Sequence, residues 1–101
     1  MTRIILLLGF LLLCSSCVGP YPIEEHTLAR AAIQAAKEKN ADRYAPGLWF
    51  KAEQTYKRAE RQARNQEHDD AKSTFMRAKR LAERAEVTAR VKKFQSGDTF
   101  P

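Results

Sequence analysis

Hydrophobic residues form one unbroken run near the start of the chain and afterwards recur only at helical spacing. The run extends from Ile4 to Leu13, follows the basic Arg3 and contains a single glycine. It is too short to span a bilayer comfortably, and with its basic start and the small residues that follow it has the three-part pattern of a secretory signal. The pattern therefore predicts a leader that is removed on export.

Two later stretches carry apolar residues spaced alternately by four and three positions. The first set consists of Ala45, Trp49, Ala52, Tyr56, Ala59 and Ala63. The second set consists of Ala71, Phe75, Ala78, Ala82, Ala85 and Ala89. Such spacing places each set on one seam of a helix at the coiled-coil period. Residues 65–68 form a short polar break between them, and Asp69 or Asp70 is the expected N-cap of the second helix. This predicts an antiparallel helical hairpin.

A third helix is predicted before the hairpin, from about Ile23 to about Asn40. Pro22 suits its first turn, and its apolar positions are mostly alanines, with Leu28 and Ile33 as the bulky members. Residues 40–47 interrupt the helical pattern because Pro46 forces the preceding residue away from helical geometry. The expected fold is therefore all-α, a coiled-coil-like three-helix bundle.

A second apolar set lies off the two seams. Its members are Phe50, Met76, Val87, Val91 and Phe94. A bare hairpin would leave these side chains in water, so we expect either the first helix, through Leu28 and Ile33, or a second copy of the protein to cover them. Alanine removes little area from water, so the core is thin and self-association into a homo-oligomer is expected.

Small Ser15 and Ser16 directly before Cys17, behind the Leu-rich run, resemble the lipobox of bacterial lipoproteins. In that family the cysteine becomes the lipidated first residue of the mature protein. The third residue before it is usually Leu or Val, whereas here it is Cys14. The resemblance implies a signal peptide over residues 1–16 and a lipidated Cys17 with its tether over 17–22. An ordinary signal peptide cut nearby and an uncleaved membrane anchor remain alternatives.

The two cysteines agree with lipidation. Cys14 would leave with the leader and Cys17 would be blocked by lipid, so the mature chain has no thiol for a disulfide, a metal site or a nucleophile. In the lipoprotein family an Asp after the cysteine signals retention in the inner membrane, and Val18 stands there instead. We therefore expect an outer-membrane anchor facing the periplasm, ahead of an inner-membrane or soluble periplasmic location.

The rest of the chain forms one Ala-rich domain over residues 23–94, followed by a tail over 95–101 that is expected to be flexible. With 18 Lys and Arg against 12 Asp and Glu, the net charge is +6. A basic exported chain meets anionic head groups, lipopolysaccharide phosphates or cell-wall carboxylates, and export removes it from nucleic acid. Alternatively the charges are solvated helix faces with acidic partners four residues away, as in Glu53–Lys57, Glu60–Arg64 and Glu86–Arg90.

No catalytic, cofactor-binding or metal-ligating set is predicted. His26 and His68 lie in different segments without ligand spacing, and no Gly-rich phosphate loop or nucleophile with a base is present in the sequence. The protein is therefore not expected to be an enzyme. A possible interaction patch consists of Tyr44, Trp49, Phe50 and Tyr56. Such a patch suits a sugar or a partner helix, although packing at the end of the bundle is the favoured explanation.

Residues 29–33, 41–46 and 52–59, with the final Ala-rich helix, resemble a family of small bacterial lipoproteins that carry a domain of unknown function. The resemblance covers about Thr27 to Ala89. It implies an Ala-rich helical fold and an uncharacterised activity. Relatives often also carry a peptidoglycan-binding domain like that of outer-membrane protein A, and no such domain is expected within residues 1–101.

The expected function is a non-enzymatic, lipid-anchored envelope lipoprotein whose helices contact an envelope protein or the cell wall. One alternative is a structural spacer that resembles the major outer-membrane lipoprotein. That protein is joined to the wall through a C-terminal Lys, whereas this chain ends in Pro101, so peptidoglycan contact would be non-covalent. The other alternative is a soluble exported helical protein.

Overall fold

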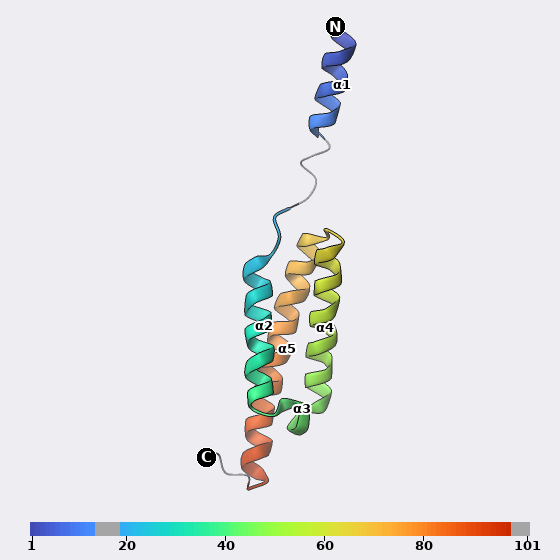
Figure 1. Ribbon diagram of the computed structural model, residues 1–101. Helices are drawn as coiled ribbons and strands as arrows, with labels where there is room; N and C mark the ends of the chain where they lie inside the picture. Colours follow the sequence, from blue (N-terminus) through green and yellow to red (C-terminus); the bar gives the residue numbers. More distant parts are fainter. Residues whose placement is uncertain (14–18, 98–101) are drawn as a thin grey trace.

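The computed structural model describes residues 1–13 and 19–97, and within these ranges all regular structure is helical (Figure 1). The helices are α1 (Thr2–Leu13), α2 (Ile23–Glu38), α3 (Ala41–Tyr44), α4 (Pro46–Arg64) and α5 (His68–Gln95). The expected all-α class is confirmed. Cys17 and residues 98–101 of the predicted tail lie outside the described residues, and the described chain ends in a turn at residues 96–97.

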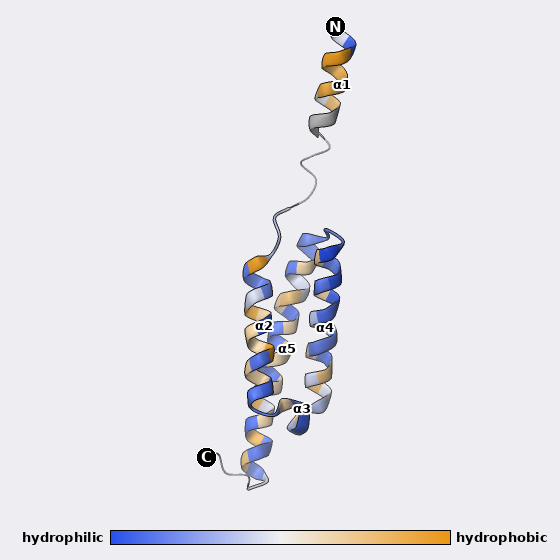
Figure 2. Cartoon of the chain, in the orientation of Figure 1, coloured by the Kyte–Doolittle hydropathy of each residue, from blue (hydrophilic) through white to orange (hydrophobic). Residues whose placement is uncertain are grey.

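The first helix, α1, lies apart from the others and is the most hydrophobic part of the described chain (Figure 2). Its apolar side chains from Ile4 to Phe10 are exposed, Ile5 to 70%. Its helical form agrees with the continuous apolar run. Within the described ranges, none of the helices has the length and apolar character needed to cross a membrane.

Helix α5 is the element against which the others pack. It makes its most extensive contacts with α4 and then with α2, whereas α2 and α4 contact each other much less. A short loop reverses the chain between α4 and α5, so these two helices run antiparallel, and α2 lies along α5 in the same direction as α5 (Figure 1). The short α3 closes the opposite end, between α2 and α4.

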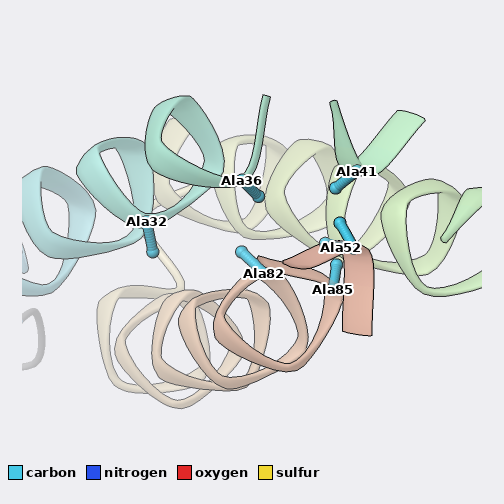
Figure 3. Close-up of a cluster of buried hydrophobic side chains, with 7 residues drawn as sticks. Ala32, Ala36, Ala41, Ala52, Ala82 and Ala85 are labelled. Carbon is cyan, nitrogen blue, oxygen red and sulfur yellow. The ribbon is translucent and has the colours of Figure 1, made fainter. Parts of the chain in front are cut away.

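The seam predicted for α5 is its buried face. All six seam residues have an exposed fraction of 0%. The alanines of the α4 seam are likewise buried, while Trp49 and Tyr56 are partly buried, and α2 contributes Ala29, Ala32 and Ala36. Figure 3 shows alanines from four helices pointing toward one another. Because the distance between packed helices depends on the side chains at the contact, alanines allow the backbones to approach closely.

Phe75 is the one large side chain that is fully buried in the described part of the chain. It belongs to a second cluster, nearer the start of α5, formed with alanines of α2, α4 and α5 and with Tyr56 packed against it. The Phe75 ring thus fills the space between α2, α4 and α5 at this end, where the neighbouring buried side chains are alanines.

Two predicted helix boundaries are wrong. Helix α5 begins at His68 with Glu67 as its N-cap, so Asp69 and Asp70 lie in its first turn and neither is the cap. Their carboxylates still suit the positive end of the helix dipole. Helix α2 ends at Glu38, earlier than expected, and Asn40 takes a left-handed conformation with φ of 58°. Asparagine tolerates that conformation better than most residues, which allows the tight turn into α3.

Much of the second apolar set is not covered by α2. Ile33 packs into the alanine cluster, but Leu28 is 40% exposed, and Phe50, Val87, Val91 and Phe94 are also exposed. The prediction that the first helix covers part of this set is therefore wrong for these four side chains, whereas Met76 is partly buried. It fails because α2 lies along the alanine seam of α5, and α5 continues beyond the ends of the other helices (Figure 1).

We expect Ala82→Leu to destabilise the protein by about 1–3 kcal/mol, because the added methylenes would enter a closely packed contact between helices. Ala31→Leu is the matched control, since Ala31 is exposed on α2 and should change stability by less than about 0.5 kcal/mol. Urea unfolding followed by circular dichroism measures both. Equal stabilities for the two variants would contradict the close packing at Ala82.

Candidate functional site

Aromatic and histidine side chains from four parts of the chain meet where α2 and α5 begin. We call this group the tether-end cluster. Its members are Tyr21, His26, Tyr56, His68 and Phe75. The chain before α2, α2 itself, α4 and α5 each contribute at least one ring, so the cluster joins the predicted tether to the three long helices.

His26 lies at the centre of the tether-end cluster. Its ring stacks on Phe75 with centroids 4.6 Å apart and an angle of 14° between the ring planes. Its Nδ1 lies 2.7 Å from Tyr21 Oη, and its Nε2 lies 2.8 Å from Tyr56 Oη. Arg30 Nη2 is 3.3 Å from the same Nε2. Since a guanidinium only donates, Nε2 accepts, and Nδ1 of the neutral ring carries the proton that it donates to Tyr21.

The second histidine holds the backbone of the tether. His68 Nδ1 donates to the carbonyl oxygen of Gly19 at 2.6 Å, and the edge of the His68 ring meets Tyr21 at a centroid distance of 5.7 Å. A Cβ at Gly19 would lie 3.4 Å from a carboxylate oxygen of Asp69, so the chain passes close to the start of α5. The two histidines, which the sequence separates, thus contact the same tyrosine.

The environment of His26 favours its neutral form. Partial burial lowers the pKa of His26 below its usual value of 6.5, and the positive charge of Arg30 lowers the pKa further. The carboxylate of Glu60 opposes both effects and raises the pKa. Neutral His26 is also what the hydrogen bonds require, because a charged ring has no nitrogen left to accept from Tyr56 or Arg30.

The hydrogen bonds of the tether-end cluster hold the tether against the helices. The polar atoms of His26 bond to tyrosines and Arg30, and His68 bonds to the backbone of the tether. Over residues 1–13 and 19–97, no three His, Cys, Asp or Glu side chains gather where they would hold a metal ion. The chemistry that the cluster offers is a docked connection between tether and helices.

A second feature is a groove of about 540 Å³ between α4 and α5, which we call the basic groove. Its lining residues are Phe50, Lys51, Gln54, Thr55, Arg58, Arg77, Arg80, Leu81 and Arg84. Five of these are cationic and none is acidic. The ion pairs found within the described ranges are Lys72–Glu25, Lys79–Glu83 and Arg90–Glu86, so none of them neutralises a cation of the groove.

The charge pattern of the surface agrees only partly with the sequence. Glu86 and Arg90 pair as expected, but the expected pairs of Glu53 and Glu60 are not among the ion pairs of the described residues. Those two carboxylates line a mixed-charge hollow of about 370 Å³ between α2 and α4. Acidic side chains thus gather on one side of α4, whereas the other side is purely basic.

The structure divides the predicted aromatic patch, because Trp49 and Tyr56 line the mixed-charge hollow and Phe50 lines the basic groove. Tyr44 and Trp49 pack against the alanine cluster, and Tyr56 belongs to the tether-end cluster. Phe50 is 63% exposed and lines the basic groove. The sequence placed all four near the start of one helix, but neighbouring residues on a helix face different directions.

Comparison with known proteins places most of the chain in a family. The family described as Domain of unknown function (DUF4398) matches residues 24–97. This match agrees with the resemblance to a domain of unknown function that the sequence showed. The curated proteins contain no match to the chain. The solved structures contain none either.

We expect the protein to lose stability as the pH falls through the His26 titration. The unfolded chain binds a proton near pH 6.5, whereas folded His26 binds it only at lower pH, so acidification below about pH 6.5 favours unfolding until the folded pKa is passed. Urea unfolding between about pH 7.5 and about pH 5 should therefore show a smaller fall in stability for His26→Gln than for the wild type.

His68→Gln is the control for this measurement, because it removes the other histidine of the tether-end cluster. It should retain the part of the pH dependence that comes from His26. An unchanged pH dependence in His26→Gln would show that the His26 contacts do not determine acid stability.

Proposed function

We propose that this chain, which belongs to the DUF4398 family of domains of unknown function, is a non-enzymatic lipoprotein of the bacterial envelope. Cys17 carries the lipid, and residues 1–16 are the signal peptide. The protein is anchored in the outer membrane and faces the periplasm. Its three long helices act as one coiled-coil-like bundle that serves as an interaction module for an envelope protein or, in second place, the cell wall.

The observation that supports this proposal most is the docking of the tether on one end of the helices. His68 binds the backbone at Gly19, and Tyr21 contacts both histidines. The few residues between Cys17 and Pro22 span at most about 20 Å, since an extended chain advances about 3.3–3.6 Å per residue. A lipid on Cys17 therefore keeps this end of the bundle close to the membrane.

The character of α1 supports removal of the leader. Its apolar side chains from Ile4 to Phe10 are exposed, and it contacts no other helix in the described part of the chain. The helices from α2 onward thus lose no packing against α1 when the leader is removed. Bacterial lipoproteins with a lipobox carry three acyl chains. Because two membrane signals already give stable anchoring, three chains on Cys17 would hold the protein at the membrane.

The alternatives differ in what holds the protein in place. A structural spacer would contact peptidoglycan non-covalently, and the five cations of the basic groove offer partners for its carboxylates. A soluble exported protein would have the same helices without a lipid. Only the soluble alternative makes a different prediction for Cys17, because a spacer of this kind would also carry the lipid.

We expect metabolic labelling with palmitate to mark the wild type and not Cys17→Ser, because only a thiol at the lipobox position takes the lipid as a thioether. Cys14→Ser is the matched control, since this cysteine leaves with the leader and its replacement should leave labelling intact. Wild type should fractionate with the outer membrane, and Cys17→Ser should not.

The result contradicts the anchor if Cys17→Ser still takes label or if the wild type takes none. Wild type without label but present in the periplasmic fraction would establish the soluble exported alternative. Label on the wild type with fractionation to the inner membrane would retain the lipid and correct the location.

A further inference from the structure

We propose that the basic groove is a docking site for an acidic amphipathic helix of a partner protein. This inference rests on the proposed function only in that the partner shares the envelope compartment. It adds the site on the bundle and the chemical class of the partner. The groove is lined by α4 and α5 alone, so α2 leaves this side of the pair open.

The groove has the spacing of a helix-packing surface. On α5, Arg77, Leu81 and Arg84 are separated by four and three positions, and Thr88 and Val91 continue the same alternation. On α4, Lys51, Thr55 and Arg58 follow it as well. This is the period of the buried alanine seams, displaced around each helix. A helix of a partner protein that lies between these rows of α4 and α5 can therefore pack its own side chains between theirs, because all three repeat with the coiled-coil period.

The lining is both apolar and cationic, which suits a helix that is itself two-faced. Phe50 is 63% exposed and Leu81 is half-buried, so an apolar row on the partner would cover ring and aliphatic surface. A cell-wall polymer would offer carboxylates to the arginines and sugar rings to Phe50, but it has no apolar row to cover the aliphatic surface of Leu81. Docking of an amphipathic helix in a groove uses both properties at once.

The charges determine the sign of the partner. Lys51 and Arg58 lie two turns apart on α4, as do Arg77 and Arg84 on α5, a separation of about 10 Å along each helix. Glutamates repeated at the same interval on a partner helix would meet these cations. Guanidinium groups bind carboxylates through two parallel hydrogen bonds, which adds geometric specificity.

Two copies of this chain do not pair groove to groove. The chain has a net charge of +6, and the groove has five cations without an acidic neighbour in its lining. Two such surfaces repel each other, and like charges brought together at an interface cost several kcal/mol. The expected self-association therefore belongs to another surface, and the basic groove is left for a protein of opposite charge.

The test places a photoreactive phenylalanine analogue at Phe50 of the full chain in intact cells, with Gln34 as the control position. Phe50 lines the basic groove, whereas Gln34 is exposed on α2 and lines the mixed-charge hollow. Irradiation should crosslink Phe50, and not Gln34, to a protein segment identified by mass spectrometry. We expect that segment to be rich in Asp and Glu with apolar residues spaced by three and four.

The arginines are tested in the same crosslinking strain. Arg77→Gln with Arg84→Gln should reduce the product about tenfold or more, because hydrogen bonds between charged groups contribute more than neutral ones. Arg61→Gln with Arg64→Gln removes the same charge from exposed positions of α4 outside the groove and should leave the product unchanged. Circular dichroism of both double variants checks that the helices remain folded.

Several outcomes would overturn the docking site. These are a crosslink to peptidoglycan, to phospholipid or to a second copy, a crosslinked segment that is not acidic, and a product that is insensitive to the arginines. The docking site would also be overturned if the analogue at position 50 gave no more crosslinked product than the analogue at position 34. If palmitate labelling succeeds while Phe50 fails, the anchor stands and the groove is wrong. If Cys17→Ser keeps the label while the analogue at position 50 captures an acidic helix, the lipid anchor is wrong and the docking site stands.

Discussion

The close contact of alanines along α5 is the constraint on which the rest of the structure depends. Five of the six seam residues of α5 are alanines, and all six are fully buried. Each alanine removes little apolar area from water, so the free energy of packing comes from many short contacts between backbones rather than from large side chains. Both α2 and α4 therefore have to lie along α5, and a change in the size of one seam residue affects two contacts.

The same constraint explains where the larger side chains are found. A seam of alanines leaves no space for rings between helices, so Phe50, Val91 and Phe94 remain exposed. Phe75 is the exception, and the ring of His26 stacks on it. The one place where the seam of α5 admits a large residue is thus also where the tether docks. Removing bulky residues from the core leaves them at the surfaces where a lipid-anchored module would meet other molecules.

Charge is distributed unevenly around α4, and this separates its two sides chemically. Glu53 and Glu60 face the hollow shared with α2, and Glu60 reaches far enough to affect the pKa of His26. Lys51 and Arg58 face the groove shared with α5. Helical geometry produces this separation from residues that alternate along the chain. One side of α4 supports the tether-end cluster, and the other supplies the cations proposed to bind a partner.

Periodicity is a local property, so the sequence alone predicted the three long helices α2, α4 and α5, their buried alanines and the family resemblance, although α3 lies in the segment expected to be an interruption. It also placed the interruption before Pro46 correctly, because proline restricts its neighbour whatever the fold. The tether-end cluster was out of reach, since His26 and His68 meet Tyr21 only once the helices are packed. The division of the predicted patch between two surfaces was out of reach for the same reason. Phe50 and Tyr56 share a helix, and only the positions of α2 and α5 decide that one lies in the basic groove and the other beside His26.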